Sequence, residues 1–526
     1  MRRNVPTRWL MLSISSTAGV LALIGAWLRP LWHDELYTLE LARLPIGELF
    51  SALVVDSGPP LHYLLCHYLF VLVGWQEASM LGTLMVRLPS VLAFALLPWV
   101  VWQARPVDGR GGAWGPLLVI AWLPLLYFGT EARAYALLAL VNALLWICGP
   151  KWIGRGGKWA FFFAALAACL PLLHYVGFMS FVLLPSLVFF MPRQRRRVLA
   201  LVLVLAALPV LAWMPVMLGA PSESMAWVAT EAGPGRPGIA TVSVLAPAGP
   251  FPALFEFFGS PVPPWMSLLA LGVLAAGAIF GASILSRNRR VEDASSQNAI
   301  RLSFALLPVI GVGLLALNGV PIYFAGRTES MVWALAATLV AIFIFELPRI
   351  VRRIVAGSYV VIGVTTIAMW IADLPSRMPA TGVEVGYELS SMMEEGDRVV
   401  VAGLWQLEVR HGLARSLLDG SAADLEIVKV ETVPRSQADH PGWLDREAVT
   451  SPEIYDEARA LRESAAAEGS RIWLVWSPAL PLESNFFPAF AGWNRGRVAG
   501  SPIIAVDLLT PPSAGESSLS GMDVVR

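Results

Sequence analysis

The sequence contains few charged residues. Asp, Glu, Lys and Arg make up 14% of its 526 residues, whereas soluble proteins carry about 25%. Hydrophobic residues make up 56%, and the mean hydropathy is +0.63. This composition excludes an ordinary soluble globular protein. The formal net charge is zero, so the charge balance gives no reason to expect binding to nucleic acid.

Cysteine and the common nucleotide or metal motifs are also scarce. The three cysteines, Cys66, Cys148 and Cys169, all lie in apolar stretches, so we expect no disulfides. The sequence contains no P-loop, no dinucleotide-binding fingerprint, no HExxH and no zinc spacing. Apart from its apolar runs the chain shows no internal repeat, which weakens a transporter interpretation because many carriers are built from two related halves.

The sequence is instead dominated by apolar runs near the length that crosses a bilayer, roughly 20 residues. The first run follows MRRNVPTRW and resembles a signal peptide, but no small-residue cleavage site precedes Trp27, so we interpret it as a retained helix. We predict an α-helical polytopic membrane protein with about eleven transmembrane helices. The predicted spans are 9–28, 86–103, 113–129, 134–150, 159–173, 176–191, 198–218, 265–285, 302–318, 329–347 and 355–372.

One run, Pro60–Gly74, is ambiguous because it is short and contains His62 and His67. If this run does not cross, most loop arginines and lysines fall on one side of the membrane. The other side then receives only Arg29, Arg43, Arg87, Arg133, Arg236 and Arg327. If the run crosses, that separation collapses. We therefore expect a cytoplasmic N-terminus, with residues 31–86 forming juxtamembrane helices on the outer surface.

The composition also predicts the domains. Residues 1–373 form the transmembrane module, with an outer loop at 219–264 that is rich in Pro, Gly and Ala and is typical of a lid. Residues 374–510 form a small extracytoplasmic α/β domain, and the tail 511–526 is expected to be disordered. The predicted strands of this domain are Arg398–Ala402, Leu425–Val430, Arg471–Trp476 and Ile503–Leu508, and one helix is predicted to start at Ser451.

Three acids of the outer region 31–86 are the first candidates for chemistry. Asp34 and Glu35 follow the first span, and Asp56 precedes Pro59-Pro60. A carboxylate that faces a bound hydroxyl acts as a general base, and a second one nearby orients it or binds a metal. The alternative is that Asp34 and Glu35 are solvated acids after a membrane helix. The proline pair by itself only ends one helix and starts the next.

The predicted topology brings further polar residues to the same outer face. Arg133, just after Glu131 at the start of a span, needs an anionic partner: either Glu131 or a phosphate, which a guanidinium fork suits. His174 lies at an outer helix end, as a hydrogen-bonded interfacial residue or as a catalyst. Tyr323 and Arg327 lead into another span at this face, and Arg327 is the second candidate phosphate ligand.

These residues fall in ordered motifs. In order from Trp32 to Phe178, the segments read WHDELYTLELA, DSGPPLHYLL, VRLPS, FGTEARAYALLAL and LLHYVGF. Together they resemble the bacterial polytopic glycosyltransferases of the GT-C class. The similarity is to protein O-mannosyltransferase-like and rhizobial galacturonosyltransferase-like enzymes, and more distantly to the lipid A aminoarabinose transferase. It fades around Tyr323–Trp333 and does not extend to the C-terminal domain.

The resemblance implies transfer of a sugar from a polyprenyl-phosphate donor to a hydroxyl acceptor (protein, lipid or polysaccharide) at the outer face of the bacterial inner membrane. It implies Asp34 as the catalytic base, with Glu35 and Asp56 as its partner acids. Arg133 and Arg327 would stabilise the leaving lipid phosphate, with inversion at the anomeric carbon. Ser57-Gly58 stand where many relatives have Val-His. If that histidine helps catalysis in the relatives, either His62 or His33 replaces it here or its role is lost in this chain.

Two points stay open at this stage. A divalent metal at Glu35 and Asp56 is compatible with the sequence but not required by it. A transporter or flippase of lipid-linked sugars is the alternative function, and it predicts polar groups and helix breaks deep in the spans. A structural membrane protein whose soluble domain binds a partner is the third interpretation.

Overall fold

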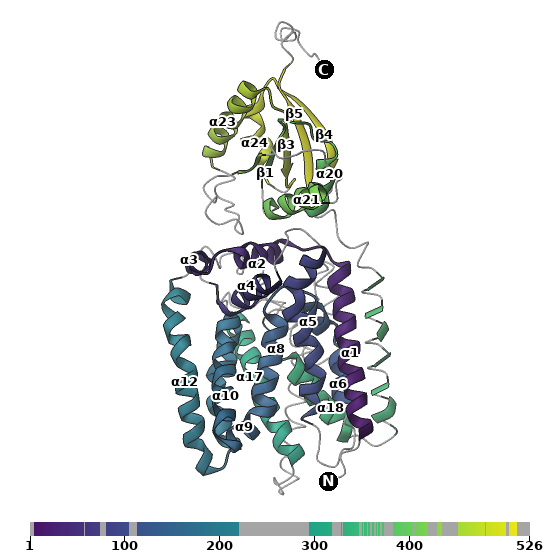
Figure 1. Ribbon diagram of the computed structural model, residues 1–526, viewed down its shortest axis with the longest axis vertical. Coiled ribbons are helices and arrows are strands. Elements are labelled where there is room, and N and C mark those ends of the chain that lie inside the picture. Colours follow the sequence, from purple (N-terminus) through teal and green to yellow (C-terminus); the bar gives the residue numbers. More distant parts are fainter. Residues whose placement is uncertain are drawn as a thin grey trace. The chain divides into compact units, whose positions relative to one another are not determined.

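Figure 1 shows a computed structural model of the chain. It describes residues 5–56, 58–73, 80–104, 113–219, 294–317, 328, 330–346, parts of 350–372, 382–402, 405–418, 429–433, 451–478, 480–500 and 504–512. Most of the predicted lid loop, the predicted span 265–285 and most of the predicted tail lie outside these residues. The chain divides into two compact units. Unit 1 comprises Met1–Leu28, Leu41–Leu72 and Leu84–Asp373, and unit 2 comprises Arg29–Glu40, Val73–Thr83 and Leu374–Arg526.

Unit 1 is built from helices. Helices α2 (His33–Arg43) and α5 (Met80–Trp102) begin in unit 2 and end in unit 1. The described helices of unit 1 are α1 (Val5–Leu28), α3 (Ile46–Asp56), α4 (Leu61–Val73), α5 (Met80–Trp102), α6 (Trp114–Ala121), α7 (Leu123–Gly129), α8 (Tyr135–Ala143), the π-helix η1 (Leu144–Cys148), α9 (Gly149–Arg155), α10 (Lys158–Leu173), α11 (Tyr175–Leu183), the 3-10 helix η2 (Leu184–Phe190), α12 (Arg193–Leu218), α17 (Ala294–Leu317) and α18 (Trp333–Glu346).

Several of these helices are membrane-spanning in length and composition. Within the described residues, the helical stretches Arg8–Leu28, Leu81–Trp102, Tyr135–Arg155 and Arg193–Leu218 are long and apolar enough to cross a bilayer. The stretch predicted as one span at 113–129 is instead two short helices. Pro124 explains the break, because it lies at the start of α7 and has no N–H to continue a helix from α6.

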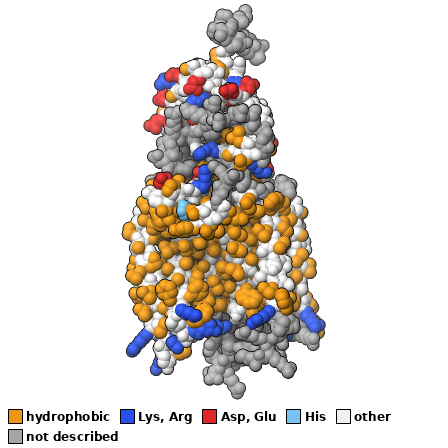
Figure 2. Space-filling model, viewed as in Figure 1, with side chains coloured by type: hydrophobic (Ala, Val, Ile, Leu, Met, Phe, Trp, Pro, Cys, Tyr) orange, Lys and Arg blue, Asp and Glu red, His pale blue; other side chains and the backbone are white. Residues whose placement is uncertain are grey.

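The surface of unit 1 is apolar, as expected for helices in contact with lipid. In α1, Ala18, Ala22 and Ala26 face the interior and are fully buried, whereas Val20 and Leu23 are exposed. Small residues inside and large apolar residues outside are typical of membrane helices, since small residues let the helices approach closely. Figure 2 shows hydrophobic side chains over most of the helical region, with Lys and Arg gathered at its lower edge. The chain is therefore a multi-pass membrane protein.

The short helices α3 and α4 lie at the end of unit 1 opposite to the N-terminus and α9 (Figure 1). Helix α3 buries Leu49 and Leu53 completely and exposes Val54 and Val55, so it is apolar on its outward face as well. Helix α4 has 13 residues, fewer than the roughly 20 that cross a bilayer. Its length agrees with the prediction that Pro60–Gly74 does not span.

The C-terminal part of unit 2 is an α/β domain with one five-stranded sheet in the order β2-β1-β3-β5-β4. The strand β1 pairs in parallel with β2 and β3, whereas β5 pairs antiparallel with β3 and β4. Its elements are α20 (Gly382–Ser390), β1 (Arg398–Ala402), α21 (Gln406–Leu418), β2 (Lys429–Val433), α23 (Glu453–Glu468), β3 (Ile472–Trp476), α24 (Leu482–Asn485), the 3-10 helix η4 (Phe487–Phe490), β4 (Asn494–Gly500) and β5 (Ala505–Thr510).

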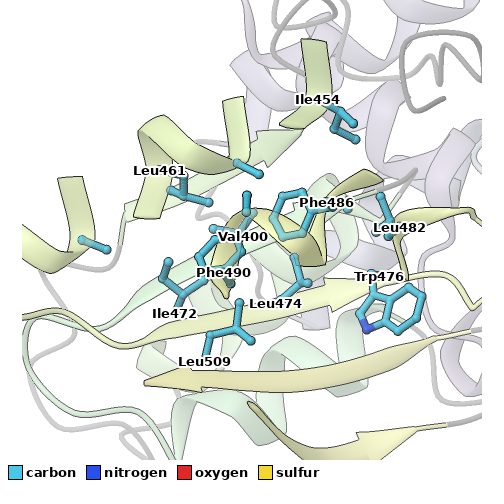
Figure 3. Close-up of a cluster of buried hydrophobic side chains, with 14 of the residues drawn as sticks. Val400, Ile454, Leu461, Ile472, Leu474, Trp476, Leu482, Phe486, Phe490 and Leu509 are labelled. Atoms are coloured by element: carbon cyan, nitrogen blue, oxygen red, sulfur yellow. The ribbon is translucent and has the colours of Figure 1, made fainter. Parts of the chain in front are cut away.

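Side chains alternate across this sheet and form a core on each face, because successive residues of a strand point to opposite sides. Val399 and Val401 pack with α20 and α21. Val400 packs on the other face with Leu461 of α23 and Phe486 and Phe490 from the α24–η4 region, as Figure 3 shows. Helices therefore cover both faces of the sheet, as in other α/β domains.

Candidate functional site

The first turn of α2 carries the two leading candidate acids. The carbonyl of Trp32 accepts hydrogen bonds from the backbone N–H groups of Glu35 (2.9 Å) and Leu36 (3.0 Å), so Trp32 is the N-cap. The Glu35 carboxylate reaches back and accepts a long bond from the Trp32 N–H at 3.4 Å. This return bond is half of a capping box. The other half needs an N-cap oxygen, which a tryptophan side chain does not have.

Asp34 and Glu35 differ in exposure. Glu35 is fully buried, and its carboxylate takes part in capping the helix. Asp34 is partly exposed, and its backbone carbonyl is fixed by the hydroxyl of Thr38 at 2.9 Å. A base must reach the proton that it removes. Of the two acids, Asp34 is therefore the more exposed one.

The turn between α7 and α8 carries Glu131 and Arg133. Glu131 is buried, and Arg133 is partly exposed. Helix α8 begins at Tyr135, so Arg133 lies in the turn before the helix. The backbone of this turn is held by two side chains. Ser90 of α5 donates to the Arg133 carbonyl at 2.9 Å, and His62 of α4 bonds the Ala132 carbonyl.

His62 is brought to this turn but is not open to solvent. Its Nε2 lies 3.1 Å from the Ala132 carbonyl and its side chain is 2% exposed. Since a carbonyl only accepts, this contact assigns the hydrogen to Nε2. The geometry makes His62 a brace for the segment that carries Glu131 and Arg133. Its contact with substrate stays a prediction.

His174 caps the next helix. It is the N-cap of α11, and its Nδ1 accepts a hydrogen bond from the Val176 N–H at 3.2 Å. Its ring lies 5.0 Å from the ring of Tyr135, the first residue of α8. The side chain is partly exposed. His174 is thus positioned beside the start of α8, with its Nδ1 held by the backbone of α11.

A buried polar link, not foreseen from the sequence, joins three segments of unit 1. Asn142 of α8 donates to the Met331 carbonyl at 2.7 Å, and Ser180 of α11 donates to the Asn142 side-chain oxygen at 2.6 Å. Asn142 and Ser180 are fully buried. Met331 follows closely after Arg327, so this link anchors the chain next to a candidate phosphate ligand. An asparagine inside an apolar span is the sequence signal for such a link.

Arg87 of α5 is another buried polar residue that sequence reasoning did not single out. Its side chain is fully buried, and its guanidinium donates to the Ala26 carbonyl at 2.5 Å. Ala26 lies in the last turn of α1, where carbonyls lack partners within the helix and attract cations. Arg87 therefore ties the end of α1 to α5.

The structure describes only part of the predicted site. Glu131, Arg133, His62 and His174 belong to unit 1, and Asp34 and Glu35 belong to unit 2. The Asp56 side chain, Tyr323 and Arg327 lie outside the described residues. In the part of the chain that the structure describes, no group of three or more His, Cys, Asp or Glu side chains is arranged to hold a metal ion.

Comparison with solved structures finds a similar fold in ArnT. No family model and no curated protein matches the chain. The crystal structure of ArnT from Cupriavidus metallidurans in the apo state is similar, with a TM-score of 0.50 and 16% identity over 96% of this chain and 98% of that one. ArnT bound to undecaprenyl phosphate aligns with a TM-score of 0.49 and 16% identity over 95% and 98% of the two chains.

The chain shares the fold of apo ArnT, which is a GT-C glycosyltransferase, the lipid A aminoarabinose transferase. This confirms the predicted fold class, a polytopic helical membrane protein with a small C-terminal α/β domain. It also agrees with the distant GT-C relationship that the motifs between Trp32 and Phe178 indicated. At 16% identity the likeness concerns the fold, and function has to be argued from the site.

Proposed function

We propose that this protein is an integral membrane glycosyltransferase that moves a sugar from a polyprenyl-phosphate donor to a hydroxyl acceptor. The observation that carries the proposal is the first turn of α2. Asp34 is partly exposed, whereas its neighbour Glu35 is buried and used in capping. A carboxylate on a fixed helical turn, open on one side, suits a general base. The fold shared with apo ArnT supports the same reaction class by analogy.

The proposed reaction is a direct displacement. The Asp34 carboxylate takes the proton of the acceptor hydroxyl, and that oxygen attacks the anomeric carbon. The bond between the anomeric carbon and the phosphate oxygen breaks, and polyprenyl phosphate leaves with the electron pair. One displacement inverts the anomeric centre. A phosphate is a good leaving group and needs positive charge more than a proton, so one carboxylate is sufficient where glycosidases need two.

Arg133 is the proposed ligand for the lipid phosphate, with Arg327 as the second. Arg133 lies in a turn whose backbone is held by hydrogen bonds from Ser90 and His62. The backbone from which the Arg133 side chain extends is therefore fixed. A guanidinium fork binds phosphate oxygens in pairs. Glu131 precedes the start of α8 in the chain, and the His174 ring lies 5.0 Å from the ring of Tyr135, the first residue of α8. We propose that Glu131 and His174 contact the sugar or its phosphate, together with Tyr323.

The proposed location is the bacterial inner membrane, with the N-terminus in the cytoplasm and the site on the outer side. Figure 2 supports this orientation, because Lys and Arg side chains gather at one edge of the helical region. Loops rich in Lys and Arg stay on the cytoplasmic side. A fusion of a reporter active only in the cytoplasm to Arg155 of α9 should be active, and one inserted after Arg43 should be inactive.

The test of the reaction class uses the purified full-length protein. It is incubated with a panel of radiolabelled polyprenyl-phosphate sugars, and loss of label from the lipid is measured for the wild type and Asp34→Asn. Release of one sugar by the wild type and not by the variant supports the proposal. If no donor in a broad panel is consumed, the proposed function is wrong.

A flippase is the rival function, and vesicles separate it from the enzyme. Proteoliposomes are loaded with a fluorescent polyprenyl-phosphate sugar, and its movement between leaflets is measured. A flippase predicts rapid movement that Asp34→Asn leaves unchanged and no release of sugar. The enzyme predicts release of sugar that Asp34→Asn abolishes. The buried link between Asn142, Ser180 and Met331 joins helices across the interior of unit 1, which favours a rigid scaffold over a rocking carrier.

A further inference from the structure

Helices α20 and α21 of unit 2 are in very close contact. A Cβ added at Gly386 would lie 2.3 Å from the Val409 carbonyl oxygen, and one added at Gly412 would lie 2.1 Å from the Val383 carbonyl oxygen. Only glycine allows this approach. The two backbones therefore meet without side chains between them, and residues next to these glycines are brought to the end of the neighbouring helix.

Glu408 of α21 is one of those residues. Its side chain is 7% exposed, and its Oε2 accepts a hydrogen bond from the backbone N–H of Gly382 at 2.8 Å. Gly382 is the first residue of α20. The first N–H groups of a helix have no partner within the helix and carry a partial positive charge. A carboxylate placed here stabilises the start of α20.

The same carboxylate accepts a second hydrogen bond, from the backbone of His33. His33 is the first residue of α2, and it belongs to unit 2 together with Glu408. One buried carboxylate thus bonds the first N–H of two helices whose starting residues are far apart in the sequence. One of these helices carries Asp34 and Glu35 in its first turn.

This second bond completes a cap that α2 lacks by itself. Its N-cap, Trp32, has no side-chain oxygen, and Glu35 accepts a bond from the Trp32 N–H at 3.4 Å. The first N–H groups of a helix, of which the His33 N–H is one, find no carbonyl acceptor within the helix. Glu408 supplies that acceptor from another part of the chain.

We propose that Glu408 is a positioning residue that caps α2 and thereby fixes Asp34, so that the C-terminal α/β domain controls the reactivity of the base. The catalytic consequence rests on the function proposed above, but the capping does not. Burial raises the pKa of Glu408 to about 7, and the bonds from Gly382 and His33 oppose this rise. The carboxylate is consequently ionised above about pH 7, where it meets the two N–H groups as an anion.

The direct test is hydrogen exchange on the full-length protein in detergent at a fixed alkaline pH. The measured peptide covers Trp32–Tyr37. Glu408→Ala should raise amide exchange in this peptide by about tenfold, the effect of losing one helix cap. Unchanged exchange there would overturn the proposal, because α2 would then be capped without Glu408.

Two further variants sharpen the test. Gly382→Ala puts a Cβ 2.6 Å from the Glu408 carboxylate oxygen, so it displaces the carboxylate without altering it, and it should raise exchange in the same peptide. Glu431→Gln is the matched control. Glu431 is a partly buried acid of unit 2 that bonds Arg398, so its loss weakens the domain without touching the cap. Exchange in Trp32–Tyr37 should stay at the wild-type level.

Activity gives the second readout. With the donor found for the wild type, Glu408→Ala should lower kcat about tenfold and leave KM for the donor within a factor of about two, since the base is misplaced and the binding groups are not. Glu408→Gln keeps one acceptor oxygen and should recover part of kcat. A change in KM alone would contradict a positioning role. If the wild type consumes no donor, the proposed function fails, while hydrogen exchange still decides the capping.

Discussion

Asp34 and Glu35 are neighbours in the first turn of α2 and have different environments. Glu35 is fully buried and accepts a bond from the N–H of the N-cap residue, whereas Asp34 is partly exposed. Adjacent helical residues point about a quarter of a turn apart, so one turn presents one acid inward and one outward. We therefore expect the two acids to have separable roles, one in structure and one in chemistry.

Substitution of each acid tests this separation. Glu35→Gln should lower the free energy of unfolding by about 1–3 kcal/mol, the cost of weakening a buried polar contact. It should leave an appreciable fraction of the transfer activity. Asp34→Asn should change stability by less than about 0.5 kcal/mol, as partly exposed positions usually do. Thermal unfolding of the two purified variants measures this difference, and equal loss of stability would contradict the assignment.

The link at Asn142 predicts a defect in both stability and activity. Asn142→Leu removes the bonds to Met331 and Ser180 and should cost about 1–2 kcal/mol, the size of interhelical hydrogen bonds in membrane proteins. Activity should fall as well, since Met331 anchors the chain near Arg327. Ser303→Ala on α17 is the control, because its exposed hydroxyl bonds only its own helix. Wild-type activity in Asn142→Leu would mean that this anchor is not needed.

Glu408 predicts a pH dependence of stability. Its pKa is raised from 4.5 to about 7, chiefly by burial. Because the folded-state pKa lies above the unfolded value, the folded protein binds this proton more tightly. The contribution of Glu408 to the free energy of unfolding is complete below pH 4.5 and is lost as the pH rises through about 7. This contribution is about 3 kcal/mol at most.

Comparison of variants isolates this group. Between pH 5 and pH 8, the Tm of the wild type should fall relative to that of Glu408→Gln, which does not titrate. The lowered pKa of Asp397, whose carboxylate bonds Arg471 and Trp473, acts in the opposite direction and only at acid pH. Parallel Tm curves over this range would show that Glu408 does not change its protonation on folding.

Asp507 is a buried charged residue of the C-terminal sheet. It is fully buried and accepts bonds from Trp476 Nε1 at 3.0 Å and Arg495 Nε at 2.9 Å, and it also bonds Arg497. Asp507→Ala leaves the buried indole N–H unsatisfied and should cost about 2–3 kcal/mol. Glu483→Gln, which also faces Arg495 but is 63% exposed, should cost less than about 1 kcal/mol. Thermal unfolding of the two variants provides the comparison.

The sequence predicted the elements that depend on local pattern. Arg398–Ala402 and Arg471–Trp476 are apolar runs of strand length and appear as β1 and β3. The missed strand, β4, reads NRGRVAG and lies at the sheet edge, where apolar alternation is not required. The predicted strand Leu425–Val430 begins before the observed β2 (Lys429–Val433) and overlaps its first two residues; all of β2 pairs with β1.

The features that local patterns did not predict are contacts between distant segments. The bond from His62 to Ala132 joins α4 to the α7–α8 turn, and Glu408 reaches α2 from a helix almost four hundred residues later in the chain. Glu408 looks like a surface acid in its own segment. Its burial follows from the close packing of α20 and α21, in which Gly382 lies against Glu408. The likeness to apo ArnT confirms the fold class that the apolar runs and motifs indicated.

The most direct test of the central claim is the rate of sugar release from a labelled polyprenyl-phosphate donor. Wild type, Asp34→Asn and Glu40→Gln would be compared, since Glu40 is a partly exposed acid on the same helix. A general base at Asp34 predicts a loss of about 10²–10⁴-fold in kcat for Asp34→Asn and wild-type activity for Glu40→Gln. Release by Asp34→Asn at the wild-type rate would contradict the account, because another group would then take the proton.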